Sequence, residues 1–168
     1  NDWSADEFQY KFTLDNPYYN PTSKKSWEKS NVFVYIHPRT TKVRAVLLLQ
    51  ENVVEQKISV HPAIRKACDA NGVAIVWCYP GYDLTFEPKL AQELHDLTQK
   101  NLKAIGESIG YPELGTAPLI LFGHSNTTAF AQNGAEARPD RVLAIIVTHG
   151  WNGVASLRFA RGTARAPS

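Results

Sequence analysis

The chain has 168 residues, of which 43% are hydrophobic and 20% are charged, a composition typical of one globular domain with a substantial core. The formal net charge is only +2, and the segment 152–168 holds three arginines and no acidic residue. Without that segment the balance is slightly negative, which argues against a nucleic-acid-binding protein. A membrane span is not expected either, because no run of about 18 apolar residues occurs.

The start of the chain and its two cysteines leave the cellular location open. The chain begins at Asn1 and contains no methionine, so residue 1 is not a translational start. Removal of a signal peptide would explain this, and so would tag removal or trimming to a domain. We expect Cys68 and Cys78 to be unpaired core thiols, whereas a disulfide would favour an exported protein. A secreted or periplasmic location and a cytoplasmic one both remain open.

The first third of the chain predicts strands separated by loops. Apolar side chains fall at every second position of 8–14, the period of a half-buried strand. The stretch 15–30 is rich in Asn, Pro, Ser and Lys, which is typical of a loop. Segments 32–36 and 43–49 are rich in β-branched and apolar residues, with a short polar stretch between them. We interpret these two segments as strands that pair with each other.

From residue 61 onward the pattern alternates between helices and continuous apolar strands. The predicted elements are a helix over 61–70 that ends at Asn71-Gly72, a strand over 73–78, a helix over 90–109 that ends at Gly110, a strand over 118–122, a helix to about Ala137 and a strand over 142–147. Such alternation implies an α/β fold, with a mostly parallel sheet and helices on both faces.

A short motif joins the strand over 118–122 to the helix that follows it. The motif is Gly123-His124-Ser125-Asn126-Thr127. A serine on a sharp strand-to-helix turn holds its Oγ out at the edge of the sheet, and the amides that follow point to where an oxyanion would form. The motif therefore predicts a nucleophile elbow and acyl-transfer chemistry.

The strands at the start, the alternating units and this motif together resemble the α/β-hydrolase superfamily over roughly residues 30–150, most closely its secreted esterase-like and polyester-depolymerase-like members. The resemblance implies a single α/β-hydrolase-like domain over 1–150, in which 1–30 form an N-terminal strand and loop. It implies a carboxylic-ester substrate, small or polymer-linked, and no cofactor. Thr127 departs from the family's pattern, because glycine is usual there and a β-branched residue would crowd the turn or alter its angle.

The resemblance also assigns roles to residues at matching positions. Ser125 would be the nucleophile, and the backbone N–H of Asn126 would be one oxyanion donor. The second donor would come from the loop after the strand over 43–49, where we choose Asn52. Three aromatic residues after the strand over 73–78 are candidates to line an acyl or sugar pocket, or else they pack the loop: Tyr79, Tyr82 and Phe86.

The catalytic acid and base are harder to find, because in this family they follow the serine in the chain. Beyond Ser125 the acids are Glu136 and Asp140, and the histidine is His149. Asp140 precedes the strand over 142–147 and is expected far from the elbow, whereas His149 follows that strand on the elbow's side. His149 is thus the later histidine that could approach Ser125, unless it only forms a turn. The histidines and cysteines show no metal-binding spacing.

The last segment, 151–168, lacks strand and helix periodicity and is expected to be a loose basic tail. We hypothesise truncation or a changed reading frame after the sixth strand, which would leave 142–147 as an apolar sheet edge and favour a homodimer or aggregation.

These expectations leave two candidate functions. The first is a serine hydrolase that cleaves carboxylic esters through an acyl-enzyme on Ser125, impaired by a missing acid and histidine. The alternative is a catalytically silent hydrolase scaffold or binding module.

Overall fold

The computed structural model describes residues 7–16, 29–81, 88–150 and 156–159. The strands are β1 (Tyr10–Asp15), β2 (Lys29–Tyr35), β3 (Ala45–Gln50), β4 (Val73–Tyr79), β5 (Leu119–His124), β6 (Val142–Thr148) and β7 (Ser156–Phe159). The helices are α1 (Glu55–Ser59), α2 (Pro62–Asn71), α3 (Pro88–Ile109), the 3-10 helix η3 (Pro112–Gly115) and α4 (Thr127–Ala137). Within the described residues the strands form one sheet in the order β1-β2-β4-β3-β5-β6-β7.

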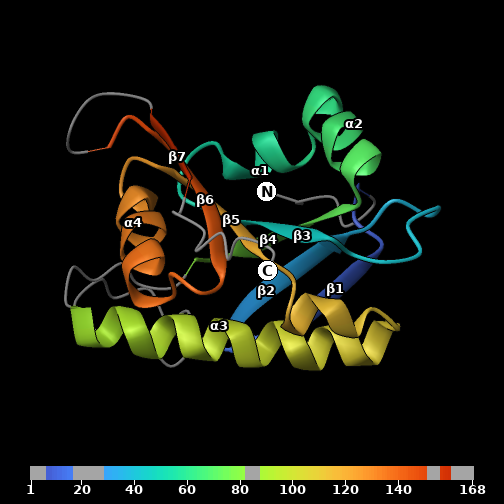
Figure 1. Ribbon diagram of the computed structural model, residues 1–168, viewed down its shortest axis with the longest axis horizontal. Helices are drawn as coiled ribbons and strands as arrows, with labels where there is room; N and C mark the ends of the chain where they lie inside the picture. Colours follow the sequence, from blue (N-terminus) through green and yellow to red (C-terminus); the bar gives the residue numbers. More distant parts are fainter. Residues whose placement is uncertain (1–6, 17–28, 82–87, 151–155, 160–168) are drawn as a thin grey trace, which may run out of the picture.

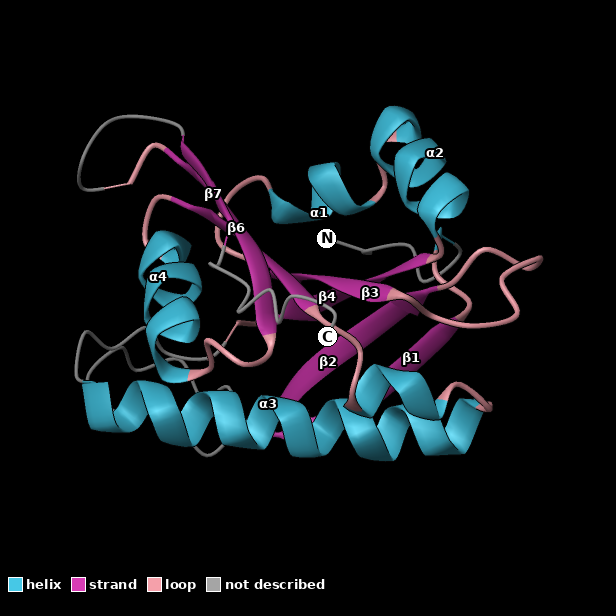
Figure 2. Ribbon diagram, in the orientation of Figure 1, coloured by secondary structure: helices cyan, strands magenta, loops and turns pink. Residues whose placement is uncertain are grey.

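The centre of the sheet is parallel, and its two sides are antiparallel. Strands β4, β3, β5 and β6 run in one direction, whereas β2 pairs antiparallel with both β1 and β4, and β7 pairs antiparallel with β6. Helices α1 and α2 lie on one face of the sheet and α3 on the other (Figure 1 and Figure 2). This arrangement confirms the α/β class with helices on both faces.

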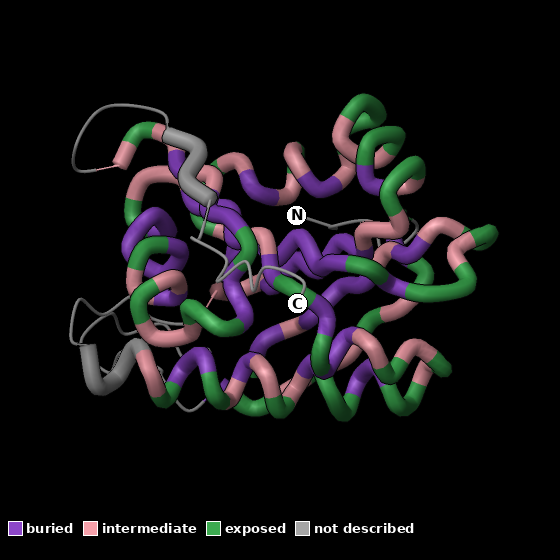
Figure 3. Tube along the Cα trace, in the orientation of Figure 1, coloured by how far each residue is buried: buried purple, intermediate pink, exposed green. Residues whose placement is uncertain are grey.

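Two hydrophobic cores lie on the two faces of the sheet, and the alternation of side chains along β3 shows why. Val46 and Leu48 belong to the core under α3 and α4, whereas Leu47 and Leu49 belong to the core under α1 and α2. Both faces of β3 are therefore buried, which Figure 3 shows as a continuous buried trace. A strand covered on both sides needs apolar residues at every position, so the sequence reads as an uninterrupted apolar run.

The predicted pairing of the segments 32–36 and 43–49 is wrong. Strand β4 lies between β2 and β3 and pairs with both of them. The chain leaves β3 through α1 and α2 and returns as β4 beside it, as a parallel crossover does. Because β4 returns on the side that faces β2, it separates the two strands that are neighbours in the sequence.

The prediction of a loose tail over 151–168 is wrong over 156–159, where β7 pairs with β6 from Ala144–Phe159 to Val147–Ser156. A four-residue strand is too short to show a period in the sequence. Because β7 covers the outer side of β6, β6 is not an edge strand, and the reason given for a homodimer through that edge no longer holds.

Both cysteines are free and buried, and neither is a candidate nucleophile. Burial raises the pKa of the Cys78 thiol to about 12, and burial and the nearby Asp69 raise that of Cys68 to about 11. A thiol must be deprotonated to attack a carbonyl, so both stay inert near neutral pH.

None of the helices that the structure describes is long and apolar enough to cross a membrane.

Candidate active site

Ser125 lies in a two-residue turn between the end of β5 at His124 and the start of α4 at Thr127. Its backbone φ is +54°, in the left-handed region that residues other than glycine rarely adopt. The turn is tied at both ends, because the Ser125 N–H donates to the Thr148 carbonyl (3.1 Å), and the Thr128 hydroxyl donates to the Ser125 carbonyl (2.6 Å). A strained serine at the tip of a central strand is the geometry of a nucleophile elbow.

The close approach of α4 to β5 depends on Gly123. A Cβ atom at this position would lie 2.4 Å from the Thr127 carbonyl oxygen and 2.8 Å from the Thr128 Cα. These are backbone atoms of the first turn of α4, so they cannot move aside as a flexible side chain would. Helix and strand therefore touch where Gly123 faces the backbone of Thr127, and a side chain at position 123 would prevent this contact.

Thr127, where the family's pattern has glycine, is 1% exposed and fits through its hydroxyl. Its Oγ1 accepts the His124 N–H (2.7 Å) and lies 2.6 Å from Oε1 of Glu55 and 2.8 Å from the His124 carbonyl. The single hydroxyl hydrogen goes to one of these two oxygens. Thr127 thus joins the elbow to Glu55 at the start of α1. Its side chain fills space that would be empty if residue 127 were glycine.

Glu55 is fully buried at the start of α1 and collects donors from two loops. Its Oε2 accepts the backbone N–H groups of Asn52 (3.0 Å), Val53 (2.9 Å) and Val54 (3.0 Å). Its Oε1 faces the Thr127 hydroxyl and also accepts the His124 N–H at 3.2 Å. One carboxyl group therefore fixes the loop after β3 against the elbow after β5.

Sequence reasoning missed Glu55. The signal was faint: an acidic residue directly after Val53 and Val54, in a stretch with no helical or strand period. Sequence reasoning also gave no role to Glu51, at the start of the same loop. Glu51 accepts from the indole Nε1–H of Trp77 and from the Gln56 N–H, both at 2.8 Å, and burial raises the pKa of its carboxyl. Two carboxyl groups thus hold the loop after β3, because Glu51 bonds to β4 and α1 and Glu55 bonds to the elbow.

The two residues predicted as oxyanion donors, Asn126 and Asn52, flank Ser125 from different loops. Among the described residues no acceptor takes the backbone N–H of Asn126, which precedes the first residue of α4. Such an N–H at a helix start is free to bind an anion. The Asn52 N–H is taken by Glu55, but the Asn52 side-chain amide donates to the His124 carbonyl at 3.2 Å.

His149 lies beside the elbow, because His124 and Thr148 are paired residues of β5 and β6 and His149 follows Thr148. Its φ is +53°, and its ring lies 5.1 Å from the ring of His124, at 57° to it. His124 in turn has its Nδ1 2.9 Å from the Thr148 hydroxyl. In the part of the chain that the structure describes, the Ser125 Oγ has no hydrogen-bond partner, histidine or otherwise.

The two later acids lie away from Ser125, as the sequence predicts for Asp140. Asp140 precedes β6, at the end of the sheet opposite the elbow, and is paired with Arg138 (3.0 Å), whose hydrogen bonds lower the pKa of its carboxyl. Glu136 is exposed near the end of α4, about 14 Å along the helix from its start at Thr127. Neither acid can orient a histidine at the elbow from these positions.

Of the aromatic residues proposed to line a pocket, Tyr79 lies at the end of β4, half-buried and stacked on Trp77 with ring centroids 6.0 Å apart. Tyr82 and Phe86 lie outside the described residues. The described His, Cys, Asp and Glu residues form no group of three that could hold a metal ion.

Comparison with known proteins supports the fold but no sequence family. No protein-family model matches the chain, and no curated protein matches it in sequence. Among solved structures it is similar to the siderophore hydrolase EstB from Aspergillus nidulans (TM-score 0.56, 19% identity, 86% of this chain and 57% of that one). It is also similar to the siderophore hydrolase EstA from the same organism (0.55, 13%, 84% and 56%) and to an acetyl xylan esterase from Aspergillus awamori (0.53, 9%, 88% and 57%).

The chain therefore spans a little over half the length of these three structures. At such low identity the similarity concerns the arrangement of the backbone. The chain has the α/β-hydrolase fold.

Proposed function

We propose that this chain is a serine hydrolase that acts on carboxylic esters, with Ser125 as its nucleophile. The observation that carries the proposal is the positive φ of Ser125 in a two-residue turn between a central parallel strand and a helix. A non-glycine residue held in this conformation costs about 1–3 kcal/mol, so the surrounding contacts must impose it. Two siderophore hydrolases and an acetyl xylan esterase share the fold, which supports hydrolytic chemistry and, through the esterase, an ester substrate.

In the proposed reaction the Oγ of Ser125 attacks the ester carbonyl carbon and gives up its proton to a base. The carbonyl oxygen becomes an oxyanion, which the Asn126 N–H and the side-chain amide of Asn52 stabilise. Collapse of this intermediate breaks the bond to the alcohol, which leaves with the proton. Water then attacks the acyl-enzyme by the same route and releases the acid. Each oxyanion donor supplies on the order of 3 kcal/mol of transition-state stabilisation.

We assign the base to His149, because its backbone directly adjoins the elbow across the β5–β6 pair. Thr148 already accepts the Ser125 N–H, so the main chain of residue 149 starts beside the nucleophile. A histidine has a pKa near neutrality and can take and return the proton. We propose that Tyr79, at the end of β4, lines the acyl or sugar side of the substrate together with Tyr82 and Phe86, which follow it in the sequence.

One observation favours the alternative of a catalytically silent scaffold. The Ser125 Oγ has no hydrogen-bond partner among the described residues, whereas an assembled triad joins serine to histidine and histidine to a carboxylate. A scaffold of this kind would keep the elbow and bind an ester without turning it over.

Hydrolysis of p-nitrophenyl acetate separates the two functions. We expect turnover above background for the wild type, loss of that turnover in Ser125→Ala, and a reduction of about 100-fold or more in His149→Ala. Ser108→Ala is the matched control, because Ser108 is exposed on α3 and only bonds to the Ile105 carbonyl of its own helix. Equal rates for wild type and Ser125→Ala would contradict the enzyme and leave the silent scaffold.

A further inference from the structure

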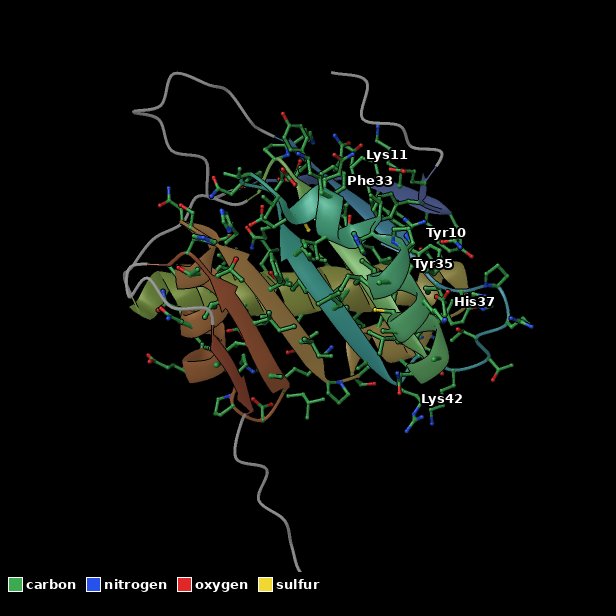
Figure 4. The ribbon with its side chains drawn as sticks, turned by 90° about the horizontal axis from the view of Figure 1, so that it is seen from above. Tyr10, Lys11, Phe33, Tyr35, His37 and Lys42 are labelled. Carbon is green, nitrogen blue, oxygen red and sulfur yellow. The ribbon has the colours of Figure 1, made fainter. Side chains whose placement is uncertain are left out.

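A basic cleft of about 660 Å³ lies between α2 and the loop that precedes β3. Figure 4 shows His37 and Lys42, which belong to this loop, beside α2. Five cationic side chains and a single carboxylate, that of Asp69, line the cleft. The cations are Arg39, Lys42, Arg44, Arg65 and Lys66.

The protein offsets only a small part of the positive charge of this cleft. None of the five cations forms an ion pair with any described residue. Asp69 accepts a hydrogen bond from the Tyr35 hydroxyl (3.2 Å) instead. The formal net charge of the whole chain is +2, so five cations around one cavity are a local concentration rather than a general property of the surface. Such a concentration attracts anions.

The contacts that hold the walls of the cleft in place involve neutral groups, so they do not cancel its positive charge. The guanidinium of Arg65 lies over the Tyr35 ring (4.1 Å) and donates to the carbonyls of Ser59 and Glu7, which are neutral acceptors. The loop is fixed at its middle, where the Tyr111 hydroxyl donates to the Thr40 carbonyl (3.1 Å), and at its end, where the Arg44 N–H donates to the Gly72 carbonyl (2.8 Å). A ligand would therefore meet a largely formed site.

The cleft is remote from Ser125. It lies at the N-terminal ends of β3 and β4, whereas Ser125 follows the C-terminal end of β5, which runs parallel to β3. Six residues of strand separate the two ends of the sheet by about 20 Å. The group bound in this cleft is therefore not the ester bond presented to Ser125.

We propose that this cleft binds a small molecule that carries two or more phosphate groups. Its volume suits a small ligand. Guanidinium groups match the oxygens of a phosphate in pairs, and lysines add point charges, so three arginines and two lysines exceed what one carboxylate or one phosphate needs. A long nucleic acid fits less well, because acidic residues outnumber basic ones in the rest of the chain.

The test is a calorimetric titration of the full chain with inorganic tripolyphosphate at low and at physiological ionic strength. We expect saturable binding at one site that weakens as salt rises. The double variant Lys42→Gln/Arg44→Gln removes two exposed charges from the cleft and should weaken binding about tenfold or more. Lys100→Gln/Lys103→Gln removes the same charge from exposed positions on α3, across the sheet, and should change it less than about twofold.

Three results would overturn the proposal. The first is the absence of saturable binding to a folded wild-type chain. The second is an equal loss of affinity in the two double variants, which would show attraction to net charge alone. The third is binding of orthophosphate as tight as that of tripolyphosphate, since a site for two or more phosphates must distinguish them. Both double variants should melt at the wild-type temperature, because all four side chains are exposed.

Discussion

Replacement of Glu55 by alanine should destabilise the fold strongly, although Glu55 lies outside every motif in the sequence. The side chain is 0% exposed and accepts three consecutive loop amides, those of Asn52, Val53 and Val54, together with donors from the elbow. Truncation leaves all of these donors without their acceptor. It should therefore loosen the loop after β3 and the elbow after β5 together.

The magnitude follows from the exposure of each donor. A donor that loses its partner while it stays buried costs about 1–3 kcal/mol. Asn52 and Val53 are exposed and Val54 is half-buried, so water can reach these amides and we count about 1 kcal/mol each. The Thr127 hydroxyl can turn to the His124 carbonyl, and removal of a buried carboxyl group recovers part of its desolvation cost. We expect a total loss of about 3 kcal/mol for Glu55→Ala.

Urea unfolding measures this loss directly, with a shift of the midpoint at constant slope as the expected signature. Glu55→Gln should lose about 2 kcal/mol, because its amide NH₂ must face one of the two groups of donors. Glu136→Ala is the matched control, since Glu136 is exposed on α4, and it should change the stability by less than about 0.5 kcal/mol. A loss within about 1 kcal/mol for Glu55→Ala would refute the role of this carboxyl group.

Three further predictions concern the packing around α4. The pKa of His95 is lowered to about 4, mainly by burial, although its Nε2 donates to the Phe130 carbonyl (3.2 Å). Between this pKa and the ordinary value of 6.5 the unfolded chain binds one more proton than the folded chain, so the free energy of unfolding should fall by about 2 kcal/mol from pH 7 to pH 5. Urea unfolding at the two pH values should show this loss in the wild type and not in His95→Gln. Gly123→Ala should lower the free energy of unfolding by about 3 kcal/mol or more in the same assay, because its Cβ would meet the Thr127 backbone at 2.4 Å. Gly110→Ala is the control and should lower it by about 1 kcal/mol, because Gly110 has a φ of +81° but open space around it. Equal losses would contradict the close approach at the elbow. Thr127→Val should lose about 1–2 kcal/mol and Thr127→Ser less than half of that, since only serine keeps the hydroxyl; a Val variant as stable as wild type would show that the hydroxyl contributes nothing.

The elements that the sequence predicted well are those set by local chemistry. The helix that ends at Gly72 was predictable, because Asn-Gly is a common helix stop and Gly72 adopts φ +66° there. The strand–turn–helix around Ser125 was predictable for the same reason, since an apolar run, a small-residue turn and a helix follow one another within 20 residues. Each of these signals lies within a few positions of the feature that it predicts.

What the sequence could not predict depends on residues far apart in the chain. The order of β2, β4 and β3 is decided by the side on which a crossover returns, which leaves no local trace. The contact of Glu55 with His124 joins residues 69 positions apart. Strand β7 has only four residues, too few for a period of two to be visible in the sequence. It pairs with β6, an apolar strand that would otherwise expose an unpaired edge.

The measurement that most directly tests whether Ser125 is an activated nucleophile is the intact mass of the chain before and after treatment with a fluorophosphonate. Only an activated serine reacts at a useful rate, so we expect one stoichiometric adduct on the wild type and none on Ser125→Ala. Loss of the adduct in His149→Ala as well would identify the base. A folded wild-type chain that stays unlabelled would contradict the proposed hydrolase and mean that the elbow persists without an active triad.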